Sequence, residues 1–122
     1  MHTTVLLNIL TENAIDDLLQ TSIENPSQTY AIFKHSTRCN ISSMALNRME
    51  KTDFFEKQRI PFYYLDLIQH RNVSNYVAQQ LQVEHESPQL LIIKNGKCIA
   101  SETHNGIRES WLLEILTPSN TQ

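Results

Sequence analysis

The sequence contains little of what marks several large protein classes. Only 2 glycines and 4 prolines occur among its 122 residues, which excludes collagen-like and glycine/proline-rich low-complexity chains. The longest uninterrupted aliphatic run, Leu90 to Ile93, is far shorter than the roughly 20 residues that a membrane helix needs. The formal net charge is −3, so the chain has no basic excess that would indicate nucleic-acid binding.

Cysteine is also scarce, because Cys39 and Cys98 are the only two in the sequence. Two cysteines do not make the disulfide framework of a small secreted protein. The N-terminal segment lacks the basic stretch, apolar core and cleavage site of a secretory signal peptide. We therefore expect a cytoplasmic protein with no membrane or nucleic-acid partner. Each cysteine is then a buried apolar residue, a metal ligand or a reactive thiol.

What remains is the composition of a folded domain, with 40% hydrophobic and 19% charged residues. The length fits one domain, so we expect residues 1–122 to form a single unit with a frayed tail at 117–122. Apolar residues at helical spacing and short β-branched or aromatic runs alternate along the chain. Helices are expected at 12–22, from Cys39 or Asn40 to as far as Phe55, at 73–81 and at 111–116. Strands are expected at 29–33 (ending near His35), 61–66, 89–94 and 97–102, with 5–9 as a candidate edge strand.

The order of these elements restricts the fold. A strand–helix–strand unit implies a right-handed parallel crossover, and Asn95-Gly96 implies a tight antiparallel hairpin. A mixed four-stranded sheet with helices on both faces satisfies both conditions. The predicted class is therefore α/β, with the element order of a thioredoxin-like fold.

Cys39 is the strongest candidate for a reactive residue. It follows a strand and a short loop, begins a helix, and comes directly after Arg38. A helix N-terminus and an adjacent cation both favour the thiolate, which is the nucleophile of thiol–disulfide exchange. Ser42 stands where a dithiol enzyme has its second cysteine, so exchange at Cys39 must be monothiol. The Ser42 hydroxyl can still face the sulfur from one helical turn away.

Four other residues are candidates for supporting roles. Ser87-Pro88, just before a predicted strand, fits a cis-proline loop beside the active cysteine, where the Ser87 backbone could pair with an extended substrate. His35 and His85 are each either a donor to the thiolate or an ordinary loop histidine. Zinc could bind His35, Cys39 and His85, but a fourth ligand with convincing spacing is missing, so no metal is expected. Cys98 lies on a strand away from any helix terminus, and we interpret it as structural.

Three segments resemble the bacilliredoxins of the YtxJ type, a monothiol, thioredoxin-like family. They are residues 34–42 (KHSTRCNIS), 83–89 (VEHESPQ) and 94–97 (KNGK). The likeness extends over roughly residues 10–116. Asn40 stands where the family usually has proline, and Arg38 stands where its Thr-Cys-Pro-Ile-Ser motif has threonine.

The resemblance implies removal of bacillithiol from mixed disulfides on cytosolic proteins. Cys39 would take up the bacillithiol, and a second bacillithiol or a partner reductase would release it, with no bound cofactor. Two alternatives remain open. One is a monothiol glutaredoxin-like protein that acts on glutathione or an iron–sulfur cluster, although such carriers typically show Cys-Gly-Phe-Ser. The other is a thioredoxin-fold interaction module whose cysteine is inert.

Overall fold

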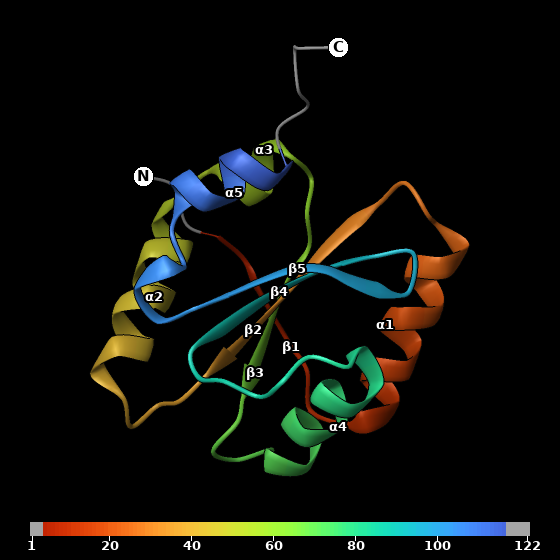
Figure 1. Ribbon diagram of the computed structural model, residues 1–122, viewed down its shortest axis with the longest axis horizontal. Helices are drawn as coiled ribbons and strands as arrows, with labels where there is room; N and C mark the ends of the chain where they lie inside the picture. The colour runs from red at the N-terminus through yellow and green to blue at the C-terminus, as the bar shows by residue number, and fades with distance from the viewer. Residues whose placement is uncertain (1–3, 117–122) are drawn as a thin grey trace.

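The computed structural model describes residues 4–116 and contains a five-stranded mixed sheet in the order β1-β3-β2-β4-β5 (Figure 1). The strands are β1 (Leu6–Asn8), β2 (Thr29–His35), β3 (Phe62–Asp66), β4 (Gln89–Lys94) and β5 (Lys97–Thr103). Strand β3 runs parallel to β1 and β2, whereas β4 is antiparallel to β2 and β5. The sheet therefore combines the parallel crossover and the hairpin that the sequence predicted.

Helices cover both faces of this sheet, as Figure 1 shows. One face carries α2 (Asn40–Lys51), α3 (Phe54–Lys57) and α5 (Glu109–Leu116), and the other carries α1 (Glu12–Glu24) and α4 (Arg71–Leu81). A 3-10 turn, η1 (His104–Gly106), follows β5. Within residues 4–116, no helix is long and apolar enough to cross a membrane.

The strand periodicity creates two separate hydrophobic cores. Phe33 of β2 packs among side chains of the α2 face, whereas its neighbour Ile32 packs with the α1 and α4 face. Successive side chains of a strand point to opposite faces, so His35 belongs with Phe33 and Lys34 belongs with Ile32. This alternation decides which helices each residue at the end of β2 can reach.

Two sequence expectations need correction. The sheet has five strands rather than four, because residues 6–8 pair in parallel with β3 and realise the candidate edge strand. The helix that begins at Asn40 ends at Lys51 instead of reaching Phe55. Thr52 adopts an extended conformation, and its hydroxyl accepts a hydrogen bond from the Phe54 N–H, which starts the separate helix α3. The tail predicted to fray, 117–122, lies outside the described residues.

The strand register decides what lies at each end of the sheet. Lys34 pairs with Gln89 across β2 and β4, so the chain leaves β2 and enters β4 at the same end of the sheet. The loops that carry Cys39 and Pro88 therefore start from the same end of the sheet. Cys98 pairs with Ile93, near the opposite end of β4.

Candidate active site

Cys39 lies at the N-terminus of α2, as the sequence predicted. It is the N-cap residue, with extended backbone (φ −118°, ψ 121°), and its carbonyl accepts from Ser43 N–H at 3.0 Å. Its own N–H donates to the Ser36 carbonyl at 3.2 Å, which closes the short loop after β2. The residue is half-buried, and no hydrogen bond within residues 4–116 reaches its sulfur. The N–H groups of the first helical turn and the helix dipole therefore set the local field at this thiol.

Ser42 is fully buried one turn into α2, and its hydroxyl has two partners. It accepts from the Ser36 N–H at 3.0 Å and lies 2.7 Å from Nδ1 of His35. The hydroxyl proton is then free to point at Nδ1, which assigns to His35 the neutral tautomer with its proton on Nε2. The hydrogen bonds of this hydroxyl go to His35 and Ser36, and none among residues 4–116 joins it to the Cys39 sulfur. A buried hydroxyl must be satisfied, and the groups at hand are His35 and the loop backbone.

His35 occupies the last position of β2 and is buried, with 5% of its surface exposed. Its ring lies between Phe33 and Tyr64, with centroid distances of 6.1 and 5.6 Å. Burial lowers the pKa of His35, and the charge of Asp66 offsets part of that shift. Both effects together leave a neutral ring at pH 7, which agrees with its role as hydrogen-bond acceptor for Ser42.

His85 lies on the other side of the sheet. Its Nδ1 is 3.3 Å from Lys34 Nζ and 3.2 Å from Ser74 Oγ, so this histidine belongs with the α4 face. Burial and then the Lys34 charge lower its pKa. The structure thus separates the two histidines that the sequence left open as thiolate donors. Within residues 4–116, no three His, Cys, Asp or Glu side chains group to hold a metal ion.

The Ser87–Pro88 segment enters β4 beside the end of β2. The Ser87–Pro88 peptide bond is cis, as the sequence predicted. Pro88 is buried, and its carbonyl accepts from His104 N–H at 3.2 Å. The Ser87 hydroxyl is buried and has no hydrogen-bond partner in the described part of the chain. Arg38 is exposed in the loop after β2.

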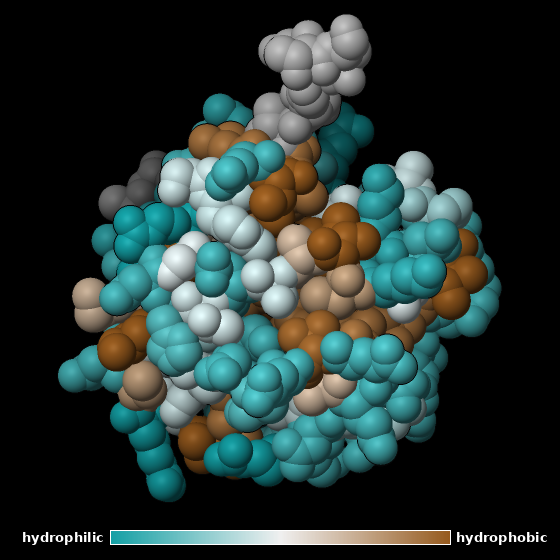
Figure 2. Space-filling view, viewed as in Figure 1, coloured by the Kyte–Doolittle hydropathy of each residue, from teal (hydrophilic) through white to brown (hydrophobic). Residues whose placement is uncertain are grey.

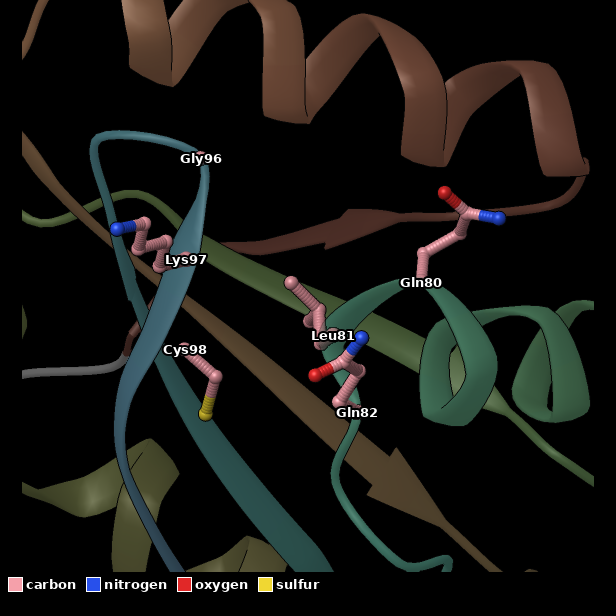
Figure 3. A pocket seen from close by; sticks show the side chains of 6 residues that line it. All are labelled: Gln80, Leu81, Gln82, Gly96, Lys97 and Cys98. Carbon is pink, nitrogen blue, oxygen red and sulfur yellow. The ribbon is translucent and has the colours of Figure 1, made fainter.

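Cys98 lies in a different environment from Cys39. It is half-buried on β5, and its thiol donates to the Ala100 carbonyl at 3.3 Å. Burial raises the pKa of the Cys98 thiol, so the protonated form is favoured. Cys98 lines an open cavity of about 300 Å³. Figure 3 shows its side chain with those of Leu81 and Gln82 at the end of α4 and with Gly96 in the hairpin. Figure 2 shows apolar surface along β5 near this region.

The geometry keeps the two cysteines apart. Cys98 pairs with Ile93, which lies four positions along β4 from Gln89. At ~3.3 Å per residue, these two positions of β4 are roughly 13 Å apart. Cys39 lies beyond Gln89, past the end of β2. A disulfide needs Cα atoms within about 7 Å, so Cys98 cannot resolve an adduct on Cys39 in this fold.

Sequence reasoning missed three residues that hold the loop before β4: Lys34, Ser74 and Gln89. One signal for Lys34 was present in the sequence, because a lysine directly follows the apolar run Tyr30–Phe33 within a buried strand. Nothing in the sequence links Ser74 or Gln89 to Lys34, because their proximity depends on strand register and on the docking of α4.

Known proteins share this fold. A solved thioredoxin-fold protein, described as a candidate oxidoreductase, is 32% identical with a TM-score of 0.74, over 90% of this chain and 92% of that one. Oxidised thioredoxin O2 from Arabidopsis thaliana is 15% identical with a TM-score of 0.72, over 97% and 100% of the two chains. Thioredoxin NaTrxh from Nicotiana alata is also 15% identical, with a TM-score of 0.71, over 93% and 91%. The two thioredoxins establish likeness of fold alone.

A family model agrees with the arrangement around Cys39. The model described as monothiol bacilliredoxin BrxC matches residues 8–112, which run from the end of β1 into α5 and include the Cys39 loop and the Ser87–Pro88 segment. A thiol-redox role follows from this match and from the thioredoxin fold. The chain therefore belongs to the monothiol bacilliredoxin family.

Proposed function

We propose that this protein removes bacillithiol from mixed disulfides on cytosolic proteins by monothiol exchange at Cys39. The observation that supports it best is the contrast between the two thiols. Cys39 is the N-cap of α2 and its sulfur has no hydrogen bond among residues 4–116, whereas the Cys98 thiol is hydrogen-bonded near the far end of the sheet. With one reactive thiol and no resolving partner, the chemistry stops at a mixed disulfide until a small thiol arrives.

The exchange proceeds in two balanced steps. The Cys39 thiolate attacks the bacillithiol sulfur of the protein mixed disulfide, a Cys39–bacillithiol bond forms, and the protein thiolate leaves and takes a proton from solvent. A second bacillithiol thiolate then attacks the sulfur of that adduct. Oxidised bacillithiol leaves, and the Cys39 thiolate is restored. One disulfide is consumed and one is formed in each step, so no other oxidant or reductant is needed.

The surrounding residues have distinct proposed roles. Arg38 adds positive charge next to the nucleophile from an exposed position. Ser42 and His35 fix the first turn of α2 against the end of β2 through their 2.7 Å contact. The Ser87 backbone lies at the same end of the sheet as Cys39, and we propose that it pairs with the extended segment around the substrate cysteine.

The direct test is the intact mass of the reduced protein after incubation with oxidised bacillithiol and, in a parallel sample, oxidised glutathione. We expect one bacillithiol adduct per chain, mapped to Cys39 by peptide analysis, and much slower adduct formation with glutathione. Equal rates with both disulfides would contradict bacillithiol selectivity. No adduct with either would favour an inert interaction module.

Turnover is measured with a purified single-cysteine protein that carries bacillithiol as a mixed disulfide, with free bacillithiol in excess. We expect release of the protein thiol at a rate proportional to the concentration of this enzyme. The matched control is the Cys39→Ala variant, which leaves the rest of the surface unchanged. Equal rates with the wild type and the variant would exclude catalysis by Cys39.

A further inference from the structure

Two buried polar side chains on neighbouring strands face the loop that leads to Ser87. Lys34 of β2 and Gln89 of β4 are cross-strand partners, and their exposed fractions are 0% and 2%. Directly paired residues project from the same face of a sheet, here the face covered by α4. Neither residue is needed to complete the strand pairing, because backbone groups make those hydrogen bonds. Their side chains are therefore free to hold something else.

What they hold is the short run of chain just before Ser87. The Gln89 amide donates to the Glu84 carbonyl at 3.0 Å, and its side-chain oxygen accepts from the Glu86 N–H at 3.4 Å. The Lys34 ammonium contacts Nδ1 of His85 at 3.3 Å. Three consecutive residues, 84–86, are thus held by two adjacent strand residues. We refer to Lys34 and Gln89 as the loop clamp.

The second contact of Lys34 fixes the clamp to a helix. Its ammonium donates to the Ser74 carbonyl at 3.0 Å, and the Ser74 hydroxyl lies 3.2 Å from the same Nδ1 of His85. His85 therefore accepts on Nδ1 and carries its proton on Nε2. The loop, the strand and α4 meet at this one imidazole nitrogen. A shift of His85 would move the chain two residues before Ser87.

A lysine at position 34 lowers the stability of the fold relative to an apolar side chain. Burial lowers its pKa from 10.5 to about 8, and no carboxylate within residues 4–116 forms an ion pair with it. A buried ammonium is generally less favourable than an apolar side chain of similar size. Stability alone would thus favour methionine at position 34. The specific contacts that lysine makes all lead to His85 and α4.

We propose that the loop clamp positions the Ser87–Pro88 segment for exchange at Cys39, with Lys34 a positioning residue that acts through His85. This inference rests on the proposed function. The clamp acts on binding of the extended protein substrate and leaves the Cys39 sulfur unaffected. It lies on the α4 face, while the nucleophile begins a helix on the opposite face.

The first test compares Lys34→Met with Lys97→Met, an exposed lysine on β5 that serves as the matched control. We expect Lys34→Met to raise KM for the protein–bacillithiol mixed disulfide roughly fivefold, the loss typical of one hydrogen bond, with kcat within twofold. The rate of Cys39 alkylation by iodoacetamide should stay unchanged, because that small reagent needs no loop. The stability of Lys34→Met should equal or exceed that of the wild type. An unchanged KM, or a KM that rises only together with a loss of stability, would overturn the proposal.

A second pair of variants covers the case in which Lys34→Met does not fold. His85→Ala removes the acceptor of the clamp from a half-buried position, whereas His85→Asn keeps an oxygen acceptor near the place of Nδ1. We expect His85→Ala to show the raised KM and His85→Asn to restore most of the wild-type value. Equal KM values for the two variants would contradict a role through this acceptor.

A measurement without substrate separates the clamp from the proposed function. Hydrogen–deuterium exchange of the amides of residues 84–87 should be faster in Lys34→Met and His85→Ala than in the wild type. If the wild type shows no turnover but this exchange still differs, the proposed function fails while the clamp stands. If the wild type turns over and this exchange is the same in all variants, the clamp is wrong and the proposed function survives.

Discussion

The two ends of the sheet each carry one cysteine, and the same thiol group has a different environment at each end. Cys39 precedes a helix, where unpaired backbone N–H groups gather, and its sulfur has no hydrogen-bond partner within residues 4–116. Cys98 is on a strand, where backbone N–H groups are used in pairing, and its thiol donates to the Ala100 carbonyl. Position at a helix start, more than exposure, distinguishes them, because both residues are half-buried.

Each end of the sheet also has a buried serine hydroxyl, and the two hydroxyls are held in a similar way. Ser42 accepts from a loop N–H and meets His35, while Ser22 accepts from the Gly96 N–H at 2.7 Å and donates to Leu19. Both are fully buried, and both connect a helix to the end of a strand or a hairpin. Only one of these connections lies beside a candidate nucleophile. A buried serine hydroxyl thus connects a helix to a strand end or hairpin at both ends of the sheet, but thiol exchange is expected only at the end with Cys39.

The largest expected effect comes from replacing each cysteine with alanine, which removes the thiol. Cys39→Ala should abolish turnover of the protein–bacillithiol mixed disulfide, because no other thiol can reach the adduct position. Cys98→Ala should retain turnover within about twofold. If Cys98→Ala loses turnover and the oxidised wild type carries a Cys39–Cys98 disulfide, the monothiol mechanism is wrong. In that case the hairpin must approach the active site.

A second prediction concerns the order of labelling at neutral pH. Iodoacetamide at limiting concentration should modify Cys39 before Cys98, because burial raises the pKa of the Cys98 thiol and keeps it protonated. We expect at least tenfold preference, measured by peptide mapping of singly labelled protein, in line with the dependence of alkylation on thiolate. Unfolding in urea should remove the preference. Preferential labelling of Cys98 in the folded protein would reverse the assignment.

A smaller effect is expected from the two buried serines, Ser42 and Ser22, at opposite ends of the sheet. Ser42→Ala and Ser22→Ala should each lower the free energy of unfolding by about 1–3 kcal/mol, because each leaves buried polar groups without a partner. Only Ser42→Ala should also slow exchange at Cys39, by a few-fold. Chemical denaturation and turnover assays on the two variants test this. Equal loss of turnover in both would mean that stability, and not the geometry around Cys39, explains the effect.

The smallest expected effects depend on pH and have opposite directions at the two ends. The folded-state pKa of His35 is lowered, so its contribution to stability is present above pH ~6.5 and is lost as the pH falls through the folded value. The pKa of Cys98 is raised, so its contribution is present below pH ~8.5 and is lost as the pH rises further. Burial also lowers the pKa of Lys34 to about 8 and the pKa of His85, so these two groups change the wild-type profile as well. Each contribution is therefore measured by urea denaturation from pH 5 to 10 as the difference between the wild type and a variant. His35→Asn should reduce the acid loss, and Cys98→Ala the alkaline one; identical profiles for all three proteins would contradict both assignments.

The sequence determined much of the molecule because its signals are local. Helical spacing of apolar residues, the Asn95-Gly96 turn and the proline before β4 each act within a few residues, and they specified the α/β order. The same local physics identified Cys39, since a residue between a strand and a helix is exposed to the helix dipole whatever the rest of the chain does. Strand β1 is only a candidate in the sequence, because three residues give too little pattern to separate a strand from a loop.

Only the tertiary structure decided how distant residues combine. Ser42 and His35 are seven positions apart, yet their contact depends on how α2 docks against the end of β2. Lys34 and His85 meet only because register pairs β2 with β4 and α4 covers the same face. A one-residue shift in register would turn Lys34 to the other face and separate it from His85. The nucleophile was therefore evident from the sequence, whereas the contacts that position the loop beside it required the fold.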